Sequence, residues 1–319
     1  MAPIRISVQA EPRDIDSWLT LARRTEASGF DALLLGDHPG SGTAPWAALG
    51  AAAAVTGRLR LGTYVCQAGV REPMHLAADA ASLDILAPGR VVLGLGAGHT
   101  PREWSDIGRG RPSPADRAGR LVELVDAVAD LLQGSTVTLD GRFLCIRDAR
   151  LEGLPTGRVR LTVGGGNPEI LRVAARRADV IGLSGLGRTL PDGHRHELRW
   201  TSADLRRQLD LIESEAVAAQ RQPELEALVQ VVTVTADRDA VISGMVVDRP
   251  QLSAEELGRT PYALIGTHEQ MAEQMLANAE AWGITRYVVR GPAVPDIEQV
   301  LAMLDDGSTS GRQLGGGAP

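Results

Sequence analysis

Eight short apolar runs, separated by longer amphipathic stretches, limit the fold of this sequence most strongly. In most of these runs apolar residues follow one another without alternation, which is typical of parallel strands buried on both faces. A chain with eight strand and helix repeats favours an α/β fold closed into a (β/α)8 TIM barrel over an open sheet. The runs are residues 4–8, 32–35, 59–65, 91–95, 159–163, 180–183, 228–234 and 287–289.

Signals for the start and end of helices lie between these runs. Asp14 precedes an amphipathic stretch that closes at Gly29, and Asn167 is placed to cap another helix at its N-terminus. Thr267 and Gln270 have the spacing of a capping box. The remaining helices are expected at residues 45–56, 73–86, 116–132 and 168–178.

Two stretches interrupt the repeat. Residues 136–157 read as a hairpin that turns at Asp140 and Gly141, and residues 184–202 are rich in Gly, His and Arg. Because long loops in a barrel commonly carry function, we expect both to be insertions at the C-terminal face that cap the barrel mouth. We expect residues 1–306 to form one barrel domain and the Gly- and Ser-rich residues 307–319 to form a disordered C-terminal tail.

Charge and cysteine content exclude several classes of partner. The net charge of −7 disfavours nucleic acid and anionic lipid surfaces. No apolar stretch approaches the ~20 residues of a membrane span, and the start of the chain is too polar for a signal peptide. Cys66 and Cys145 lie in unrelated contexts, so neither a disulfide nor a metal site is indicated. We therefore expect a cytoplasmic protein with no nucleic-acid or membrane partner.

Residues just after the strands of such a barrel meet at its active-site face. A glycine run, Gly164, Gly165 and Gly166, leads into the helix capped by Asn167, and the alternatives are a phosphate cradle or a flexible turn. The run from Gly94 to Gly98 fails both registers of a dinucleotide fingerprint, and the stretch after it reads as a loop, so a Rossmann domain is disfavoured.

Four histidines are candidates for chemistry or substrate contact near these strand ends. Asp37 and His38 follow the second strand and form either an acceptor and proton-donor pair or a loop-capping pair. His99 follows the fourth strand and has either a chemical or a structural role. His194 and His196 lie in an Arg-rich segment that is either a solvated loop or a contact for substrate.

With these strand ends in place, the chain resembles the luciferase-like monooxygenase family, in the branch that uses the deazaflavin coenzyme F420. The order and spacing of several short motifs over most of the barrel carry the resemblance. They are Gly29-Phe30-Asp31, Gly36-Asp37-His38-Pro39, Arg60-Leu61-Gly62-Thr63, the stretch 77–84, Gly89-Arg90-Val91-Val92-Leu93-Gly94-Leu95-Gly96-Ala97-Gly98, Val163-Gly164-Gly165-Gly166 and Ile265-Gly266-Thr267.

The resemblance implies a cofactor lying across the barrel mouth. It implies a non-proline cis peptide between Tyr64 and Val65 beneath the ring, and His38 and His99 as catalytic residues. The implied cofactor-binding residues are Asp37, Thr63, Tyr64, Val65, Gly98, Gly164, Gly165 and Gly166.

The sequence departs from related sugar-phosphate dehydrogenases in two ways. Those enzymes carry a glutamate acid where this chain has His99, and they hold the sugar phosphate with lysines, which this chain lacks entirely. Glucose 6-phosphate is therefore a poor candidate substrate. His99 either replaces the acid or only shapes the pocket.

The resulting hypothesis is an F420-dependent oxidoreductase. Hydride passes to or from an electrophilic C=C or C=N bond of a small-molecule substrate while His38 or His99 supplies the proton. The alternatives are an FMN-dependent monooxygenase of the same family and a barrel that only stores a cofactor. We expect a homodimer.

Overall fold

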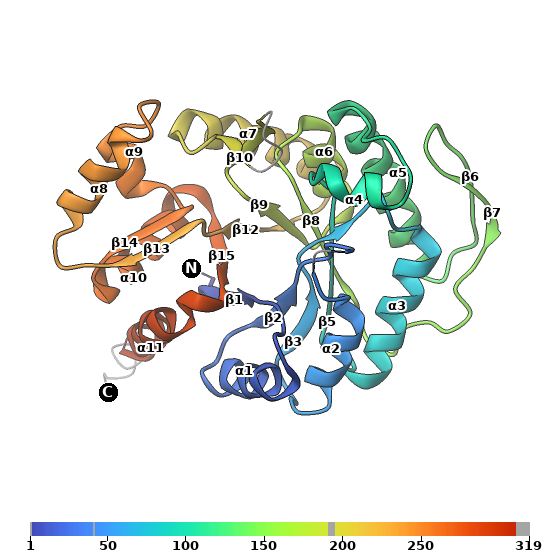
Figure 1. Ribbon diagram of the computed structural model, residues 1–319, viewed down its shortest axis with the longest axis horizontal. Helices are drawn as coiled ribbons and strands as arrows, with labels where there is room; N and C mark the ends of the chain where they lie inside the picture. The colour runs from blue at the N-terminus through green and yellow to red at the C-terminus, as the bar shows by residue number, and fades with distance from the viewer. Residues whose placement is uncertain (1, 41, 191–194, 311–319) are drawn as a thin grey trace, which may run out of the picture.

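The computed structural model describes residues 2–40, 42–190 and 195–310, the last five of these as backbone only. Within these residues, no helix combines the length and apolar character needed to cross a bilayer. The chain closes into a parallel eight-stranded barrel with helices around it, which confirms the predicted (β/α)8 fold (Figure 1).

The barrel strands pair in chain order, and β3 closes the ring by pairing with β5 through Leu61 and Val91. The third strand is interrupted, so that β3 continues as the short β4. The barrel consists of β1 (Arg5–Gln9), β2 (Ala32–Leu35), β3 (Arg60–Thr63) with β4 (Cys66–Gln67), β5 (Val91–Gly96), β8 (Arg160–Gly164), β9 (Val180–Leu183), β12 (Glu224–Leu228) and β15 (Ile284–Arg290).

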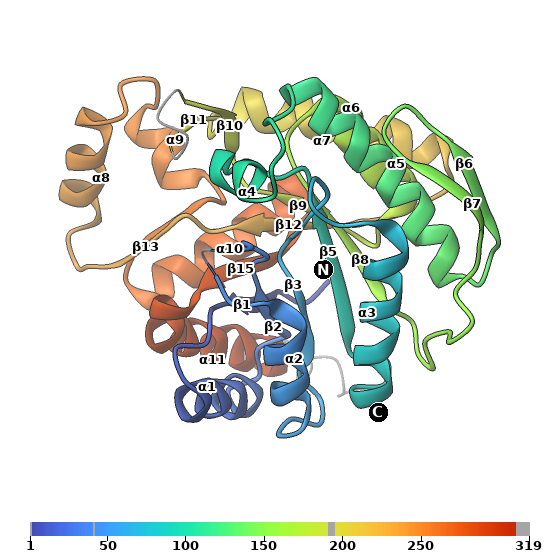
Figure 2. The ribbon, with the colours of Figure 1, turned by 45° about the vertical axis from the view of Figure 1, so that its right-hand side comes forward.

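Helices pack around the outside of this ring, as Figures 1 and 2 show from two directions. The Asp14 side chain accepts the Ser17 N–H at the start of the first helix, and Gly29 follows its end with φ 82°. The capping box of Thr267 and Gln270 is also present. The helices are α1 (Ile15–Ala27), α2 (Pro45–Ala53), α3 (Pro73–Leu86), α5 (Pro114–Leu132), α6 (Pro168–Arg177), α7 (Ser202–Ala218), α10 (His268–Trp282) and α11 (Val294–Ser310).

Successive strand residues divide between two apolar cores. Leu33 and Leu35 face the helices, whereas Ala32 and Leu34 belong to a smaller cluster inside the barrel. Tyr64 joins that inner cluster, so the break in the third strand directs a bulky side chain into the barrel interior.

The seventh strand lies elsewhere than predicted. It is Glu224–Leu228, whereas the predicted run 228–234 continues into β13 (Val231–Val234), which pairs with β14 (Ala263–Gly266) outside the barrel. The apolar pattern did not indicate this strand, because Glu224 and Glu226 within it are charged. In the folded chain both carboxylates pair with Arg286, a contact that an apolar pattern does not reveal. The helices α8 (Arg238–Val247) and α9 (Ala254–Arg259) complete this appendage.

The first predicted insertion is a hairpin, but it does not cap the mouth. β6 (Val137–Asp140) and β7 (Cys145–Ala149) pair antiparallel and lie outside α3 and α5 (Figure 2). Val137 and Leu151 pack there against Ala77 and Leu131, so apolar burial fixes the hairpin to the helices. The second insertion, β10 (Leu186–Thr189) with β11 (His196–Leu198), follows β9 and lies on the C-terminal side as predicted.

Two further segments differ from expectation. The stretch after β5, expected as a loop, contains the short helix α4 (Pro101–Asp106), and η1 (Gly291–Ala293) follows β15. Helix α11 continues to Ser310, so the first four residues of the predicted tail, 307–310, are helical. Residues 311–319 lie outside the described residues, so for them the disordered tail stays a prediction.

Candidate active site

The peptide bond between Tyr64 and Val65 is cis, as the family resemblance implied. Val65 follows the break in the third strand, and glycines of the neighbouring strands make room for its side chain. A Cβ added to Gly96 would lie 2.4 Å from Val65 Cγ2, and one added to Gly94 would lie 3.2 Å from Cγ1. Gly164 on the next strand leaves 3.5 Å. Three glycines on two strands therefore hold Val65 as a ledge at the mouth.

Thr63 and Tyr64 anchor this ledge from below. The Thr63 hydroxyl donates to the Gly94 carbonyl and accepts the Gly94 N–H, both at 3.0 Å. Gln9 Nε2 donates to the Tyr64 carbonyl at 2.6 Å. Burial raises the pKa of the Tyr64 phenol, so this side chain is a neutral group inside the barrel.

The partly exposed His38 pairs with the buried Glu103, a residue that sequence reasoning missed. His38 Nδ1 lies 2.6 Å from Glu103 Oε1, and the Gln67 amide donates to Oε2 of the same carboxylate. Glu103 is only 2% exposed. The hydrogen bond to this carboxylate and its negative charge raise the pKa of His38 above its ordinary value, against the opposing effect of burial.

Gly98 makes the contact between Gln67 and Glu103 possible. It has φ 74°, and an added Cβ would lie 2.2 Å from Gln67 Cγ. Glu103 itself is on the first turn of α4, which Pro101 starts. Pro101 after Thr100 is a signal for the start of a helix. A helix predicted at this position would have placed Glu103 near the barrel mouth.

The second predicted catalytic histidine, His99, has different surroundings. Its ring centroid lies 6.0 Å from that of His38 and 5.2 Å from that of His196, both edge to face. Desolvation, together with the nearby positive charges of His196 and His38, lowers the pKa of His99 to about 4. His99 is therefore neutral near pH 7, whereas the Glu103 contact favours the protonated form of His38. The companion His194 lies outside the described residues.

Asp37 has a different partner from its neighbour His38. Its carboxylate is buried and accepts two hydrogen bonds from Arg71, at 2.9 and 2.7 Å. This bidentate pair connects the loop after β2 with the loop after β4. Asp37 therefore fixes the loop that carries His38.

The turn from β8 to α6 has the geometry of an anion cradle. Gly165 N–H donates to Gly182 O, and the Asn167 side chain accepts the Glu169 N–H. Within the described residues, the Gly166 and Asn167 N–H groups make no hydrogen bond, and Pro168 has no N–H group. The two N–H groups of Gly166 and Asn167 lie at the positive end of the α6 dipole, where anions bind.

The predicted site residues thus come from the carboxyl ends of β2, β3, β5 and β8, on one face of the barrel. Arg290 at the end of β15 donates to the side chains of Gln9 (3.2 Å) and Gln230 (3.5 Å), both of which are neutral. The arrangement places a proton donor, an apolar ledge and an anion cradle around one barrel mouth.

Comparison with known proteins agrees with this arrangement. The luciferase-like monooxygenase family profile matches residues 1–252. The F420-dependent glucose-6-phosphate dehydrogenase of Beutenbergia cavernae is 38% identical over 193 residues, which cover 57% of this chain and 56% of that protein. The same enzyme of Kribbella flavida is 33% identical over 201 residues, 59% of each chain. The chain therefore matches little more than half the length of these relatives.

Solved structures share the fold at lower identity. An F420-dependent secondary alcohol dehydrogenase in complex with an F420-acetone adduct superposes with a TM-score of 0.70 at 20% identity, covering 91% of this chain and 93% of that one. The coenzyme F420 dependent tetrahydromethanopterin reductase of Methanopyrus kandleri gives 0.71 at 17%, covering 94% and 96%. A long-chain alkane monooxygenase gives 0.73 at 16%, covering 97% and 92%. Since the family profile spans most of the sequence, the chain belongs to the luciferase-like monooxygenase family.

Proposed function

We propose that this chain is an oxidoreductase that binds coenzyme F420 across the barrel mouth and transfers hydride between it and a small organic substrate. The relatives above 30% identity named here are F420-dependent dehydrogenases, which supports a deazaflavin over other cofactors. When bound, this cofactor accepts or donates a hydride at its ring.

Residues of this chain fit both ends of such a cofactor. The free N–H groups of Gly166 and Asn167 suit its phosphate, because they lie at a helix N-terminus and a glycine allows close approach. The Val65 ledge offers an apolar support for a flat ring, and Thr63 and Tyr64 hold that ledge from below. Gly98 at the end of β5 lets Gln67 pack against the backbone of the rim.

The observation that carries the proposal is the pair of His38 and Glu103. A hydride that reaches a substrate double bond needs a proton for the neighbouring atom, and the reverse reaction needs a base. The Glu103 carboxylate, buried and bonded to His38 Nδ1 at 2.6 Å, raises the pKa of His38, favours its protonated form and fixes the orientation of the ring that supplies the proton. The low pKa of His99 makes that residue a neutral hydrogen-bonding wall of the pocket.

The substrate in this proposal is a small molecule with an electrophilic C=C, C=N or C=O bond, or its reduced form. The glucose-6-phosphate dehydrogenases are relatives, but this chain has no lysine with which to hold a sugar phosphate. A neutral imidazole at His99, with the His196 ring centroid 5.2 Å away, favours a substrate with hydroxyl or amine groups.

The proposal extends to the setting of the enzyme. We place it in the cytoplasm as a homodimer. Ile85 and Leu86 at the end of α3 are 70% and 59% exposed, and apolar side chains of that size support an interface between copies. Light scattering of the purified protein measures the mass and checks the dimer.

Turnover tests the function directly. Protein is mixed with oxidised F420 and a panel of alcohols and amines, or with reduced F420 and the corresponding carbonyls, imines and enones, and the deazaflavin absorbance is followed. We expect turnover with one class and its loss in His38→Asn. Oxygen consumption with reduced FMN, and no F420 turnover with any of the panel, would instead support the monooxygenase of the same family.

A further inference from the structure

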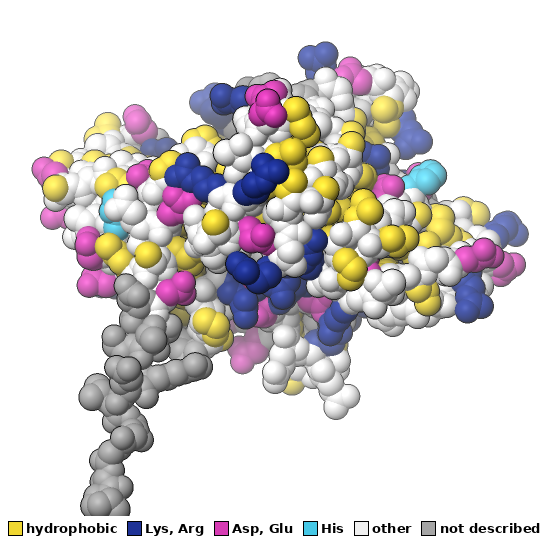
Figure 3. Space-filling view, turned by 90° about the horizontal axis from the view of Figure 1, so that it is seen from below, with side chains coloured by type: hydrophobic (Ala, Val, Ile, Leu, Met, Phe, Trp, Pro, Cys, Tyr) yellow, Lys and Arg dark blue, Asp and Glu magenta, His cyan; other side chains and the backbone are white. Residues whose placement is uncertain are grey.

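A pocket of about 420 Å³ lies at the end of the barrel opposite the active site, where the strands begin. Four arginines line it: Arg5 at the start of β1, Arg58 and Arg60 around the start of β3, and Arg90 before β5. Its volume falls in the range of small-molecule sites. Seen from below in Figure 3, arginine side chains gather toward the middle of this face of a protein whose net charge is −7.

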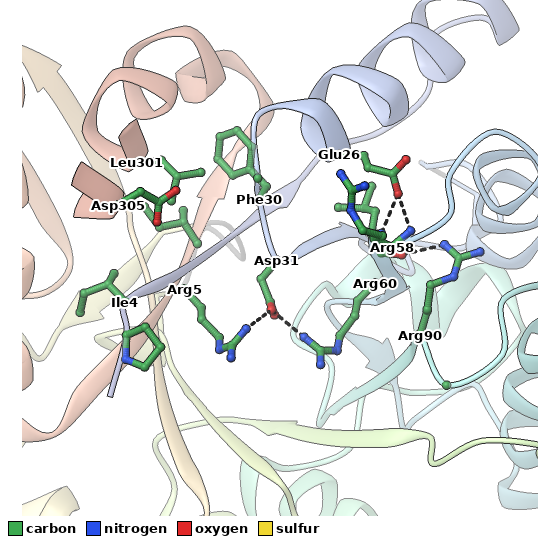
Figure 4. Close-up of a pocket in the computed structure, with 15 residues that line it drawn as sticks. Ile4, Arg5, Glu26, Phe30, Asp31, Arg58, Arg60, Arg90, Leu301 and Asp305 are labelled. Carbon is green, nitrogen blue, oxygen red and sulfur yellow. Dashed lines mark hydrogen bonds and ion pairs between the residues drawn. The ribbon is translucent and has the colours of Figure 1, made fainter. Parts of the chain in front are cut away.

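The arginines share too few carboxylates. Asp31 Oδ1 accepts from Arg5 at 3.2 Å and Arg60 at 2.6 Å (Figure 4). The other Asp31 oxygen pairs with the buried Arg286, which also pairs with Glu224 and Glu226. One carboxylate therefore meets three guanidinium groups.

In the second half of the pocket wall, Arg58 and Arg90 share the charge of one carboxylate, Glu26. Arg90 donates to the neutral oxygens of Thr56 and Leu59, and burial lowers its pKa. The nearby Glu26 places one oxygen on the backbone N–H groups of residues 57–59. Within the described part of the chain, the Arg58 side chain makes no ion pair or hydrogen bond.

These guanidinium groups retain donors that point to open space. Each guanidinium has five N–H groups, and the Arg5 and Arg60 side chains are 45% and 32% exposed. Planar guanidinium groups on two walls of one pocket match the oxygens of a phosphate in bidentate geometry. The third carboxylate of the pocket, Asp305, belongs to α11 at the other side, beside Leu301 (Figure 4).

We propose that this pocket is a second ligand site, which takes a small diphosphate-type anion between Arg58, Arg60 and Arg90. The bound group is either free inorganic pyrophosphate or the diphosphate of a nucleotide. The site is independent of the proposed function, because it lies at the opposite end of the barrel and shares no residue with the mouth.

Calorimetric titration with pyrophosphate, and separately with ADP, tests the proposal on the full chain. We expect one saturable site, with the dissociation constant raised at least about fivefold in Arg58→Ala, whose side chain makes no hydrogen bond or ion pair with the described residues. Arg147→Ala on the outer hairpin removes one exposed charge far from the pocket and serves as the control, with binding unchanged. A stronger response to ADP would identify a nucleotide, and an equal response would identify the diphosphate alone.

A second variant locates the binding. Gly166→Asp places a carboxylate at the cradle of the mouth and leaves the arginine pocket intact, so pyrophosphate binding should persist. Loss of binding in Gly166→Asp but not in Arg58→Ala would move the anion to the mouth and overturn the proposal. Equal weakening in Arg58→Ala and Arg147→Ala, or no saturable binding at all, would overturn it too.

Discussion

Nδ1 of His38 lies 2.6 Å from Oε1 of Glu103, and this contact joins the loop after β2 to the helix after β5. The carboxylate is 2% exposed, so water does not screen it from the imidazole. The two residues are far apart in the sequence, yet the contact sets the protonation of the proposed proton donor.

Glu103→Gln should lower the pKa of His38, because the amide removes the negative charge while burial of the imidazole remains. A raised pKa keeps His38 protonated to higher pH, so the variant loses the protonated form at lower pH than the parent protein. Nuclear magnetic resonance titration of the histidine Cε1 signals measures this, with the His38 signal assigned by His38→Asn. An unchanged His38 titration in Glu103→Gln would remove Glu103 from the account.

His99 should titrate separately, near pH 4. Because its folded pKa lies below its unfolded value, the neutral ring contributes stability above about pH 6.5, and this contribution is lost as the pH falls toward 4. His99→Gln should therefore lose less thermal stability than the parent between those two pH values. Thermal unfolding across the range checks it, and equal losses in both proteins would show that His99 takes up its proton as readily when folded as when unfolded.

Gly96→Ala should destabilise the fold by about 1–3 kcal/mol, because the new methyl group would lie 2.4 Å from Val65 Cγ2. Removing the opposing methyl groups in Gly96→Ala/Val65→Ala should recover part of the loss, since the two side chains compete for one space. Gly57→Ala is the control, because no atom lies within 4 Å of its added Cβ. Chemical denaturation of the parent, Gly96→Ala, Val65→Ala and the double variant measures the coupling, and strict additivity would contradict the packing described here.

At the anion cradle, Gly166→Ala and Gly166→Asp form a matched pair. The alanine Cβ would lie 3.0 Å from the flexible end of Gln208 and at an ordinary contact distance of 3.6 Å from the Leu186 carbonyl oxygen, so this variant should weaken F420 binding slightly. The aspartate adds a negative charge beside the phosphate and should weaken binding by at least about tenfold. Fluorescence titration with F420 gives both constants. Comparable affinities for the two variants would mean that the phosphate binds elsewhere.

Apolar runs and helix caps were sufficient to predict the barrel, because strands buried on both faces and capped helices leave local patterns. The seventh strand was not predicted at its true position because Glu224 and Glu226 are charged. Only the closed barrel brings Arg286 close to these two carboxylates. The hairpin of β6 and β7 was predicted as a hairpin but misplaced, because its apolar contacts are with distant helices.

The site was predictable only where residues follow strands directly. His38, Val65 and Gly165 do so, and their positions on one face agree with the sequence. Glu103 was missed because the segment after β5 reads as a loop, although Pro101 starts a helix there. The pairing of Asp37 with Arg71 needed the spatial meeting of two loops, which no local pattern records.

Comparative titration of the protein with F420 and FMN, followed by fluorescence in the absence of substrate, shows which of the two cofactors the barrel mouth binds. We expect one saturable F420 site per chain, with FMN binding at least about tenfold more weakly, and F420 binding weakened in Gly166→Asp. Tighter binding of FMN, or no saturable response to F420, would contradict this expectation.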